Sequence, residues 1–192
     1  NGADQIDGGA GTDDEVRYDF STAGVTVDLN GVAGVGGEAQ GDVLTNVENV
    51  LGSGHDDTIT GNASDNEFDG LGGDDSFEGG AGNDRIVGGT GTDTAIFGGN
   101  QADYTIAEQA DGSIQITDTN AGDGDDGTDT TISVENFQFA DGTVTASQLL
   151  APTDLAIDSS SIDENSTAGA VVGNLSAVDP SFTDTHSYTI TS

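Results

Sequence analysis

The sequence predicts an all-β protein whose centre is a solenoid of short, stacked strands. From Gly52 the chain divides into five consecutive blocks of nine residues: GSGHDDTIT, GNASDNEFD, GLGGDDSFE, GGAGNDRIV and GGTGTDTAI. Each block begins with glycine and carries an apolar residue at its eighth position. One apolar residue in nine cannot make a helix face, which needs apolar residues three to four positions apart. The period therefore favours a repeated unit of turn and strand.

Each block is expected to fold as a six-residue turn followed by a three-residue strand. Only the middle side chain of such a strand points inward, and glycine lets the turn adopt positive φ and pack closely. One block buries too little apolar surface to be stable alone, so the blocks must stack. With two blocks in each coil, the inward residues form one stack of Ile59, Phe77 and Ala95 and a second stack of Phe68 and Ile86.

Acidic side chains dominate the sixth position of the blocks. The residues at this position are Asp57, Asn66, Asp75, Asp84 and Asp93. Stacking brings Asp75 close to Asp57 and Asp93, and unscreened carboxylates at such a spacing repel each other. A Ca²⁺ ion between them removes the repulsion, because it takes six to eight oxygen ligands and accepts backbone carbonyls as well as carboxylates. Mg²⁺ demands tighter geometry and Zn²⁺ prefers His or Cys, so the sequence predicts calcium sites between stacked turns.

The overall composition restricts the function classes. The chain has 192 residues, with 36 Asp and Glu against two basic residues, and a net charge of −34. Such a composition is also typical of disorder or of an acidic surface adapted to high salt. It disfavours nucleic-acid and anionic-membrane binding, since no basic patch can neutralise phosphate. There is no cysteine, and no apolar run is long enough to span a bilayer. The chain begins inside a motif and ends inside an expected strand, so we expect it to be part of a longer protein.

The blocks resemble the nonapeptide G-G-x-G-x-D-x-U-x of the repeats-in-toxin (RTX, hemolysin-type) family, where U is a large apolar residue. GGAGNDRIV (79–87) and GGTGTDTAI (88–96) match it fully. The resemblance implies a parallel β-roll with Ca²⁺ between successive turns, in a protein exported by type I secretion. It implies side-chain ligands at Asp57, Asp75, Asp84 and Asp93, a weaker neutral ligand at Asn66, and carbonyl ligands at Gly80, Gly82, Gly89 and Gly91. Since Asn66 carries no charge, we expect the Asn66/Asp84 site to be weaker than the Asp75/Asp93 site.

Residues 1–16 are expected to be the end of another β-roll, with Asp4 and Asp13 as candidate ligands at the sixth position. An ordinary acidic turn is the alternative. Glu15 falls at the inward position and Val16 comes one place late, so we expect the register to slip and the roll to end there. Residues 17–51 are expected to be a connecting β segment, with a strand or hairpin at Val25, Val27 and Leu29. DVLTNVEN (42–49) has an echo in DTTISVEN (129–136), and we interpret both as strands that flank a roll.

The segment 97–150 is expected to be the C-terminal β cap of the central roll of 52–96. A cap is required because the last coil would otherwise expose its core and its edge. Alternation predicts strands at 104–107 and 113–118, with a turn at Asp111 and Gly112. The loop TNAGDGDDGTD (119–129) is either a further calcium loop or a solvated acidic loop. Its candidate ligands are Asp123, Asp125, Asp126 and Asp129.

Residues 151–192 lose the glycine and aspartate period. Strands are expected at 154–159, 169–176 and 186–191. The segment resembles the start of a bacterial cadherin-like, immunoglobulin-type β-sandwich through DEN (163–165) and AVVGNLSAVDP (170–180). That resemblance implies an interdomain calcium site with Glu164 and Asp179, although Ser181 stands where the family has a second aspartate. The segment is too short for a complete sandwich of about 100 residues.

No enzymatic site is predicted. The sequence has no Gly-x-Ser-x-Gly motif, and His55 falls in a repeat turn where it is expected to lie at the surface. The predicted function is a calcium-binding structural or adhesive segment of a large secreted bacterial surface protein, which folds on calcium binding after export. One alternative is the secretion and folding module of an extracellular protease, lipase or alginate epimerase. Another is a self-assembling surface-layer or filament subunit. Candidate partners besides calcium are neighbouring domains, further copies of the chain and cell-surface glycans.

Overall fold

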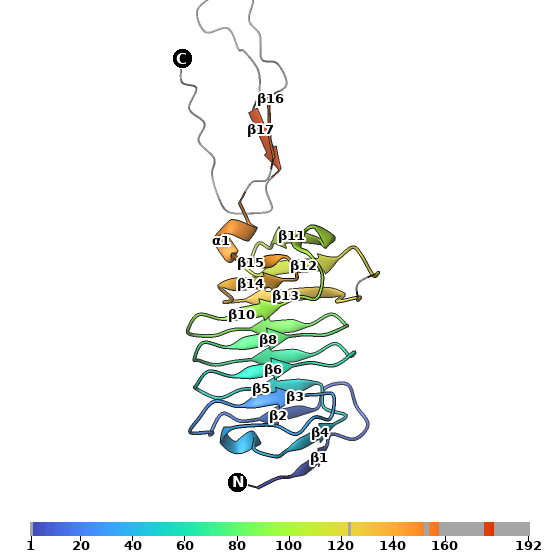
Figure 1. Ribbon diagram of the computed structural model, residues 1–192, viewed down its shortest axis with the longest axis vertical. Coiled ribbons are helices and arrows are strands. Elements are labelled where there is room, and N and C mark those ends of the chain that lie inside the picture. The colour runs from blue at the N-terminus through green and yellow to red at the C-terminus, as the bar shows by residue number, and fades with distance from the viewer. Residues whose placement is uncertain (1, 123, 152–153, 158–174, 179–192) are drawn as a thin grey trace, which may run out of the picture.

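The nonapeptides form a column of stacked coils. The computed structural model describes residues 2–122, 124–151, 154–157 and 175–178, to which all statements below refer. Figure 1 shows short strands lying across the long axis of the column, with the N-terminal strands at one end. A six-stranded sheet has the order β15-β14-β10-β8-β6-β3, and a seven-stranded sheet has the order β11-β12-β13-β9-β7-β5-β2. The fold is therefore a parallel β-roll with two facing sheets, as predicted.

The five repeat strands alternate between the two sheets. They are β6 (Thr58–Thr60), β7 (Glu67–Asp69), β8 (Ser76–Glu78), β9 (Arg85–Val87) and β10 (Thr94–Ile96). In one sheet Ile59 pairs with Phe77, and Phe77 pairs with Ala95. In the other sheet Phe68 pairs with Ile86. Both predicted stacks of inward residues are confirmed.

The core is one residue wide in each strand. The five inward residues of the repeats are at most 1% exposed, while their neighbours in the same strands are partly or fully exposed. The rings of Phe68 and Phe77 come from opposite sheets and stack with centroids 6.3 Å apart. Burial of one phenylalanine stabilises the fold by about 1.5–3 kcal/mol. The repeats thus supply a narrow apolar core between two acidic edges.

The roll extends further toward the N-terminus than the sequence indicated. The strands there are β1 (Gln5–Asp7), β2 (Glu15–Arg17), β3 (Thr26–Asp28), β4 (Val43–Thr45) and β5 (Asn49–Leu51), with the 3-10 helix η1 at Gly37–Ala39. The roll does not end near Val16, because Val16 pairs with Val50 in the seven-stranded sheet and is 8% exposed. Glu15 is exposed. The turn 8–14 is one residue longer than a nonapeptide turn, so its strand begins one place later.

Residues 17–51 are continuous with the roll and do not form a separate connection. β3 pairs in parallel with β6 through Val27 and Ile59, and β5 pairs with β7. The alternating residues Val25, Val27 and Leu29 are all buried, which confirms the strand predicted from them. β1 pairs in parallel with β4 in a small sheet of two strands. This N-terminal half contributes many of the buried apolar side chains of the molecule.

The segment after the repeats covers the last coil. Its elements are η2 (Gln101–Asp103), β11 (Tyr104–Glu108), β12 (Ile114–Asp118), β13 (Thr128–Ile132), β14 (Asn136–Phe139), β15 (Gly142–Thr145) and the short helix α1 (Ala146–Leu149). β13 and β14 continue the two parallel sheets, and antiparallel β11, β12 and β15 then end them. The predicted strands at 104–107 and 113–118 are confirmed.

Two further strands are described beyond residue 151. β16 (Asp154–Ile157) and β17 (Leu175–Val178) pair antiparallel. β16 lies within the predicted strand at 154–159, whereas β17 begins near the end of the one predicted at 169–176. The predicted strand at 186–191 and the candidate ligands Glu164 and Asp179 lie outside the described residues. In the described part of the chain, none of the helices has the length and apolar character needed to cross a membrane.

Candidate metal sites in the turns

A ladder of acidic side chains runs along each edge of the repeats. The Asp75 Oδ1 accepts a hydrogen bond from the backbone N–H of Asp57, 18 residues earlier, at 2.8 Å. The Asp93 Oδ1 accepts from the Asp75 N–H at 2.9 Å. On the opposite edge the Asp84 Oδ1 accepts from the Asn66 N–H at 2.8 Å. The structure thus places these residues in the predicted stacking order, and all five sixth-position side chains are buried.

The ladder continues through four further acidic residues, which lie outside the nonapeptide blocks. Asp42, Glu48, Asp129 and Glu135 accept the backbone N–H groups of Asp4, Asp14, Asp84 and Asp93, respectively. The echo between 42–49 and 129–136 was the available signal, because it aligns these residues in pairs. Asn46 and Ser133, also aligned in the echo, share a left-handed conformation with φ of 51° and 52°. The similar segments 42–49 and 129–136 therefore form the same short turn, in which Glu48 and Glu135 take the place of the sixth-position aspartate.

Three repeat carboxylates each have an oxygen without a partner. The Oδ2 atoms of Asp75, Asp84 and Asp93 are buried and make no hydrogen bond. Each lies over the first glycine of its own turn, since a Cβ added to Gly70 would lie 2.1 Å from the Asp75 Oδ2. The corresponding distance from Gly79 to the Asp84 Oδ2 is also 2.1 Å. An unsatisfied buried polar atom costs about 1–3 kcal/mol, and more when it is charged, so these oxygens are candidate ligands for a cation.

Backbone carbonyls line the same spaces between coils. A Cβ added to Gly70, which would approach the Asp75 Oδ2, would also lie 2.7 Å from the carbonyl oxygen of Gly88 in the next coil. The predicted carbonyl donors Gly80, Gly82, Gly89 and Gly91 all have positive φ. A Cβ on Gly89 or Gly91 would meet a carbonyl oxygen of the coil below at 2.5 or 1.8 Å. Carboxylate and carbonyl oxygens are the donor set that Ca²⁺ prefers.

Most ligands of a cation in these turns would have to come from the backbone. Within the described part of the chain, no three Asp, Glu or His side chains converge on one point that could hold a metal ion. Each of the turns that carry Asp57, Asp75, Asp84 or Asp93 instead offers a buried carboxylate together with carbonyl groups of the backbone. This fits a hard ion with a high coordination number and does not fit zinc, which is held by nitrogen and sulfur side chains.

Burial disfavours the charged form of these carboxyl groups. Desolvation raises the pKa of Asp75 to about 7 and that of Asp84 to about 6, with neighbouring carboxylates adding to both shifts. It also raises the pKa of Asp93 and takes that of Asp129 to about 8. A bound divalent cation acts in the opposite sense, because it stabilises the ionised carboxylate. Binding of a cation in these turns would therefore favour release of protons from the buried carboxyl groups.

Leu71 has a strained backbone conformation. It occupies the second turn position, where the pattern has glycine, at φ 66° and with 38% of the residue exposed. We expect Leu71→Gly to raise the free energy of unfolding by about 0.5–1 kcal/mol. Relief of left-handed strain gives about 1–2 kcal/mol, and the greater entropy of the unfolded chain offsets about 0.4–1 kcal/mol of it. Urea unfolding in calcium buffer measures the change. Leu71→Ala is the control, because it shortens the side chain but keeps the strain; an equal gain from alanine would contradict the explanation.

The other predicted ligands differ in their surroundings. Asp13 is exposed and accepts a hydrogen bond from the Asn49 side chain; because of the longer turn, Asp14 takes the sixth-position place, with a buried unpartnered Oδ2. Asp4 is exposed, and its backbone N–H donates to the Asp42 carboxylate. The Asp126 carboxylate accepts from the Tyr104 hydroxyl and the Gly98 N–H. Asp123 lies outside the described residues.

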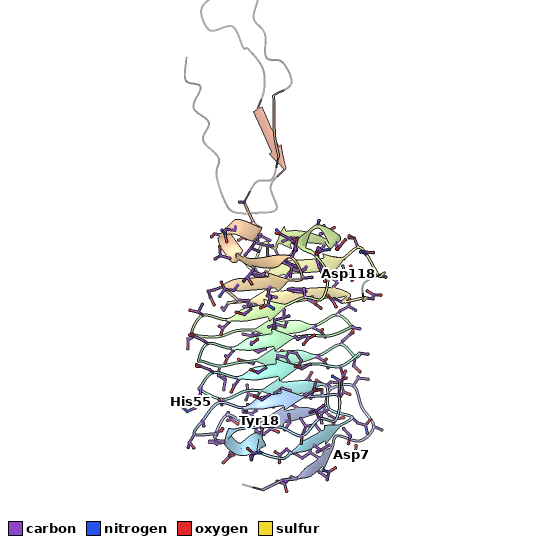
Figure 2. The ribbon with its side chains drawn as sticks, in the orientation of Figure 1. Asp7, Tyr18, His55 and Asp118 are labelled. Atoms are coloured by element: carbon purple, nitrogen blue, oxygen red, sulfur yellow. The ribbon has the colours of Figure 1, made fainter. Side chains whose placement is uncertain are left out.

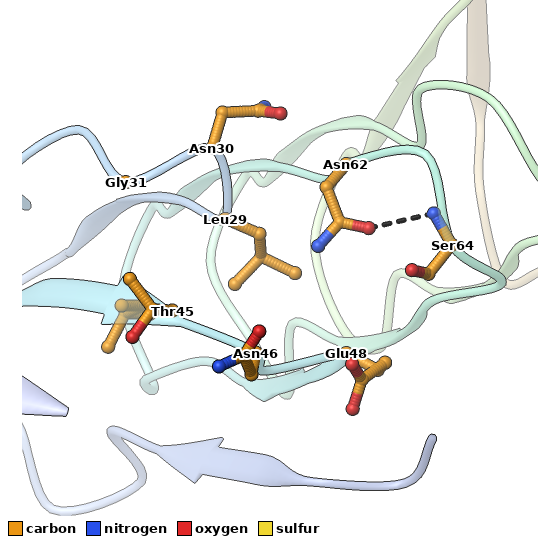
Figure 3. Close-up of a pocket in the computed structure, with 9 residues that line it drawn as sticks. Leu29, Asn30, Gly31, Thr45, Asn46, Glu48, Asn62 and Ser64 are labelled. Atoms are coloured by element: carbon orange, nitrogen blue, oxygen red, sulfur yellow. Dashed lines mark hydrogen bonds between the residues drawn. The ribbon is translucent and has the colours of Figure 1, made fainter. Parts of the chain in front are cut away.

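An exposed histidine and a surface hollow are two further features of the turns. His55 is exposed and lies at the outer edge of the roll (Figure 2). A hollow of about 360 Å³ lies beside the turn 61–66 and is lined by Leu29, Thr45, Asn46 and Asn62 among others (Figure 3). Ser64 and Glu48 also line the hollow.

Comparison with known families agrees with the geometry of the turns. Residues 51–86, 60–95 and 78–109 match the RTX calcium-binding nonapeptide repeat, which comprises four copies of the nonapeptide. No curated protein matches the chain. The matched residues include the turns of Asp57, Asn66, Asp75, Asp84 and Asp93 and the strands β6–β10. Residues 51–109 therefore carry RTX nonapeptide repeats, and the ion that these repeats bind is calcium.

Proposed function

We propose that the chain is a calcium-stabilised structural or adhesive segment of a large secreted bacterial surface protein. The observation that carries the proposal is the set of buried, unpartnered Oδ2 atoms of Asp75, Asp84 and Asp93. These carboxylates supply the side-chain ligands, and turn carbonyls, including those of Gly80, Gly82, Gly89 and Gly91, supply the others. Asp14 is a further candidate in the N-terminal turn. A bound calcium ion would supply positive charge beside carboxylate oxygens that no hydrogen-bond donor of the protein reaches, and these oxygens would coordinate it.

Calcium binding is coupled to folding of the repeats. Each site needs two neighbouring coils, because a carboxylate of one coil lies against the backbone of another. A preformed site is therefore absent from the unfolded chain, and binding free energy becomes folding free energy. At low calcium the net charge of −34 favours an extended chain. This supports export in an unfolded state and folding in the calcium-rich extracellular medium.

The role of the segment is structural and not catalytic. Asp75 and Asp84, whose pKa values are raised, accept hydrogen bonds from backbone N–H groups of the neighbouring coil. The family that matches 51–109 is defined by ion binding. We propose that 52–96 is the calcium-binding part, that 97–150 caps it, and that 151–192 begins a β-sandwich module of the kind found in tandem arrays. The antiparallel pair β16 and β17 supports a sandwich.

Calorimetric titration tests the proposed function directly. Calcium added to the chelator-treated chain is expected to bind saturably at several sites, with a parallel gain in β-sheet circular dichroism, since site and coil form together. Magnesium is the control, and the same concentration should produce little heat and no gain in sheet content, because it gives up its water ligands reluctantly. A chain that takes up no calcium, or responds equally to magnesium, would overturn the proposal.

A further inference from the structure

The turn 52–57 satisfies its own buried carboxylate. The Asp57 Oδ2 accepts the Ser53 backbone N–H at 2.6 Å, and the Asp57 Oδ1 accepts the Ser53 hydroxyl at 2.8 Å. The Val25 N–H, from the coil below, also donates to the Oδ1 at 2.8 Å. Ser53 is fully buried and Asp57 is 2% exposed. Both oxygens of this carboxylate therefore have protein donors, unlike those of Asp75, Asp84 and Asp93.

The turn 61–66 closes in a related way without any charge. The Asn66 Oδ1 accepts the Asn62 backbone N–H at 3.0 Å, and the Asn66 Nδ2 donates to the Glu48 carbonyl at 2.8 Å. The Asn62 Oδ1 accepts the Ser64 N–H at 2.8 Å, the dashed bond in Figure 3. Asn66 is 3% exposed. A neutral amide thus joins the two coils where a carboxylate and a cation would otherwise be needed.

Backbone conformation separates these two turns from the three that follow. In the turns at 70–75, 79–84 and 88–93, the second and fourth positions all have positive φ, from 66° at Leu71 to 143° at Gly91. Ser53, His55, Asn62 and Ser64 occupy those positions in the earlier turns, and none of them has positive φ. In the earlier turns the second-position N–H donates to the sixth-position side chain, whereas the Leu71 N–H donates to Asp69. Turn sequence thus selects between two ways of closing a coil.

We infer that, within the nonapeptide repeats of 52–96, the coil 52–69 closes both of its turns without calcium, and that only the turns from residue 70 onward require the ion. The inference rests on the proposed function, because it assigns which repeats need the ion. Asp57 and Asn66 are then structural residues and not ligands. The roll has a metal-independent portion, from β2 to β7, joined to a metal-dependent portion, from β8 to β10.

The metal-independent portion has its own apolar core. Buried side chains there include Val16, Val25, Val27, Leu29, Leu44, Val47, Val50, Ile59 and Phe68. Burial of each such side chain contributes about 1.5–3 kcal/mol. Among the described residues 15–69, the buried side-chain polar atoms of the turns all have hydrogen-bond partners. This portion thus has both the burial and the polar satisfaction needed to remain ordered in chelator.

Hydrogen exchange of the whole chain tests the inference without any substitution. In EDTA the backbone amides of β6 and β7, among them those of Ile59 and Phe68, should keep their protection, because their coil needs no ion. The amides of β9 and β10, among them those of Ile86 and Ala95, should exchange at least 10-fold faster than in calcium. Equal loss of protection in both portions would overturn the inference while leaving the proposed function intact. No loss in either portion would overturn both.

A gain of binding provides the second test. Ser53→Gly/His55→Gly removes the Ser53 hydroxyl that donates to Asp57 and restores glycine at the second and fourth turn positions. The turn can then adopt positive φ and direct the N–H of residue 53 away from the Asp57 carboxylate. We expect this variant to bind one more calcium ion than the natural chain in equilibrium dialysis, and β6 to become sensitive to EDTA in hydrogen exchange. Ser53→Ala is the matched control: it removes the hydroxyl but keeps a side chain at that position, so it should bind no additional ion. The inference would be overturned if the double variant bound the same number of calcium ions as the natural chain while its amides, in calcium, were as protected from exchange as those of the natural chain.

Discussion

Removal of calcium is expected to abolish the cooperative unfolding of the repeats β8–β10. A site at 100 times its dissociation constant adds about 2.7 kcal/mol to the free energy of unfolding. Sites at Asp75, Asp84 and Asp93 together therefore contribute as much as the whole stability of many domains, which is about 5–15 kcal/mol. In chelator each of the same carboxylates keeps a buried Oδ2 without a hydrogen-bond partner. Urea unfolding followed by circular dichroism, with calcium and with EDTA, measures the difference.

The loss on chelation should depend on pH. The folded-state pKa is raised to about 7 for Asp75 and to about 6 for Asp84, from an ordinary value of 3.8. A carboxyl with a raised folded-state pKa binds protons more tightly in the folded state, so it destabilises the fold as pH rises from about 4 to 7. The chelated chain should thus be more stable at pH 5 than at pH 8. In calcium the order should reverse, since protons compete with the ion. A chelated chain with the opposite pH dependence would contradict this account.

Replacing Asp75 should have the largest effect of any single aspartate substitution in the repeats. Asp75→Ala removes a calcium ligand, worth about 2.7 kcal/mol at 100 times the dissociation constant. It also leaves the buried Asp57 N–H without its acceptor, which costs about 1–3 kcal/mol. We expect a loss of about 4 kcal/mol in calcium and fewer bound ions. Glu78→Ala is the matched control, because Glu78 is an exposed acid in the adjoining strand, and it should change stability by less than about 0.5 kcal/mol.

Asp75→Asn separates charge from hydrogen bonding at the same position. Asparagine keeps an oxygen that accepts the Asp57 N–H, but it carries no charge to bind calcium or to be desolvated. The variant should therefore be less stable than the natural chain in calcium and more stable than it in EDTA at pH 8. That change of sign is specific to a metal ligand. A variant that is destabilised equally in both buffers would mean that Asp75 acts only as a hydrogen-bond acceptor.

The nine-residue period was sufficient to predict the parallel roll and its inward residues. The direction of a side chain in a short strand is a local property of the chain, so Ile59, Phe77 and Ala95 had to stack once two blocks formed one coil. The sequence also indicated the pairing of sixth-position acids, and the short cap strands β11 and β12 followed from alternation. These features depend on spacing alone.

The state of each buried carboxylate was decided only by the tertiary structure. Asp57 and Asp75 hold the same place in their blocks, but the Ser53 N–H and hydroxyl reach Asp57, whereas the Asp75 Oδ2 has no donor. The pairing of Val16 with Val50 likewise depended on one additional turn residue. The sequence by itself determined which residues face inward, because the period sets that direction. Only the three-dimensional arrangement determined which acids need a cation. A buried carboxylate oxygen needs a hydrogen-bond donor, and the backbone of its own turn and of the next coil decides whether a donor lies within reach.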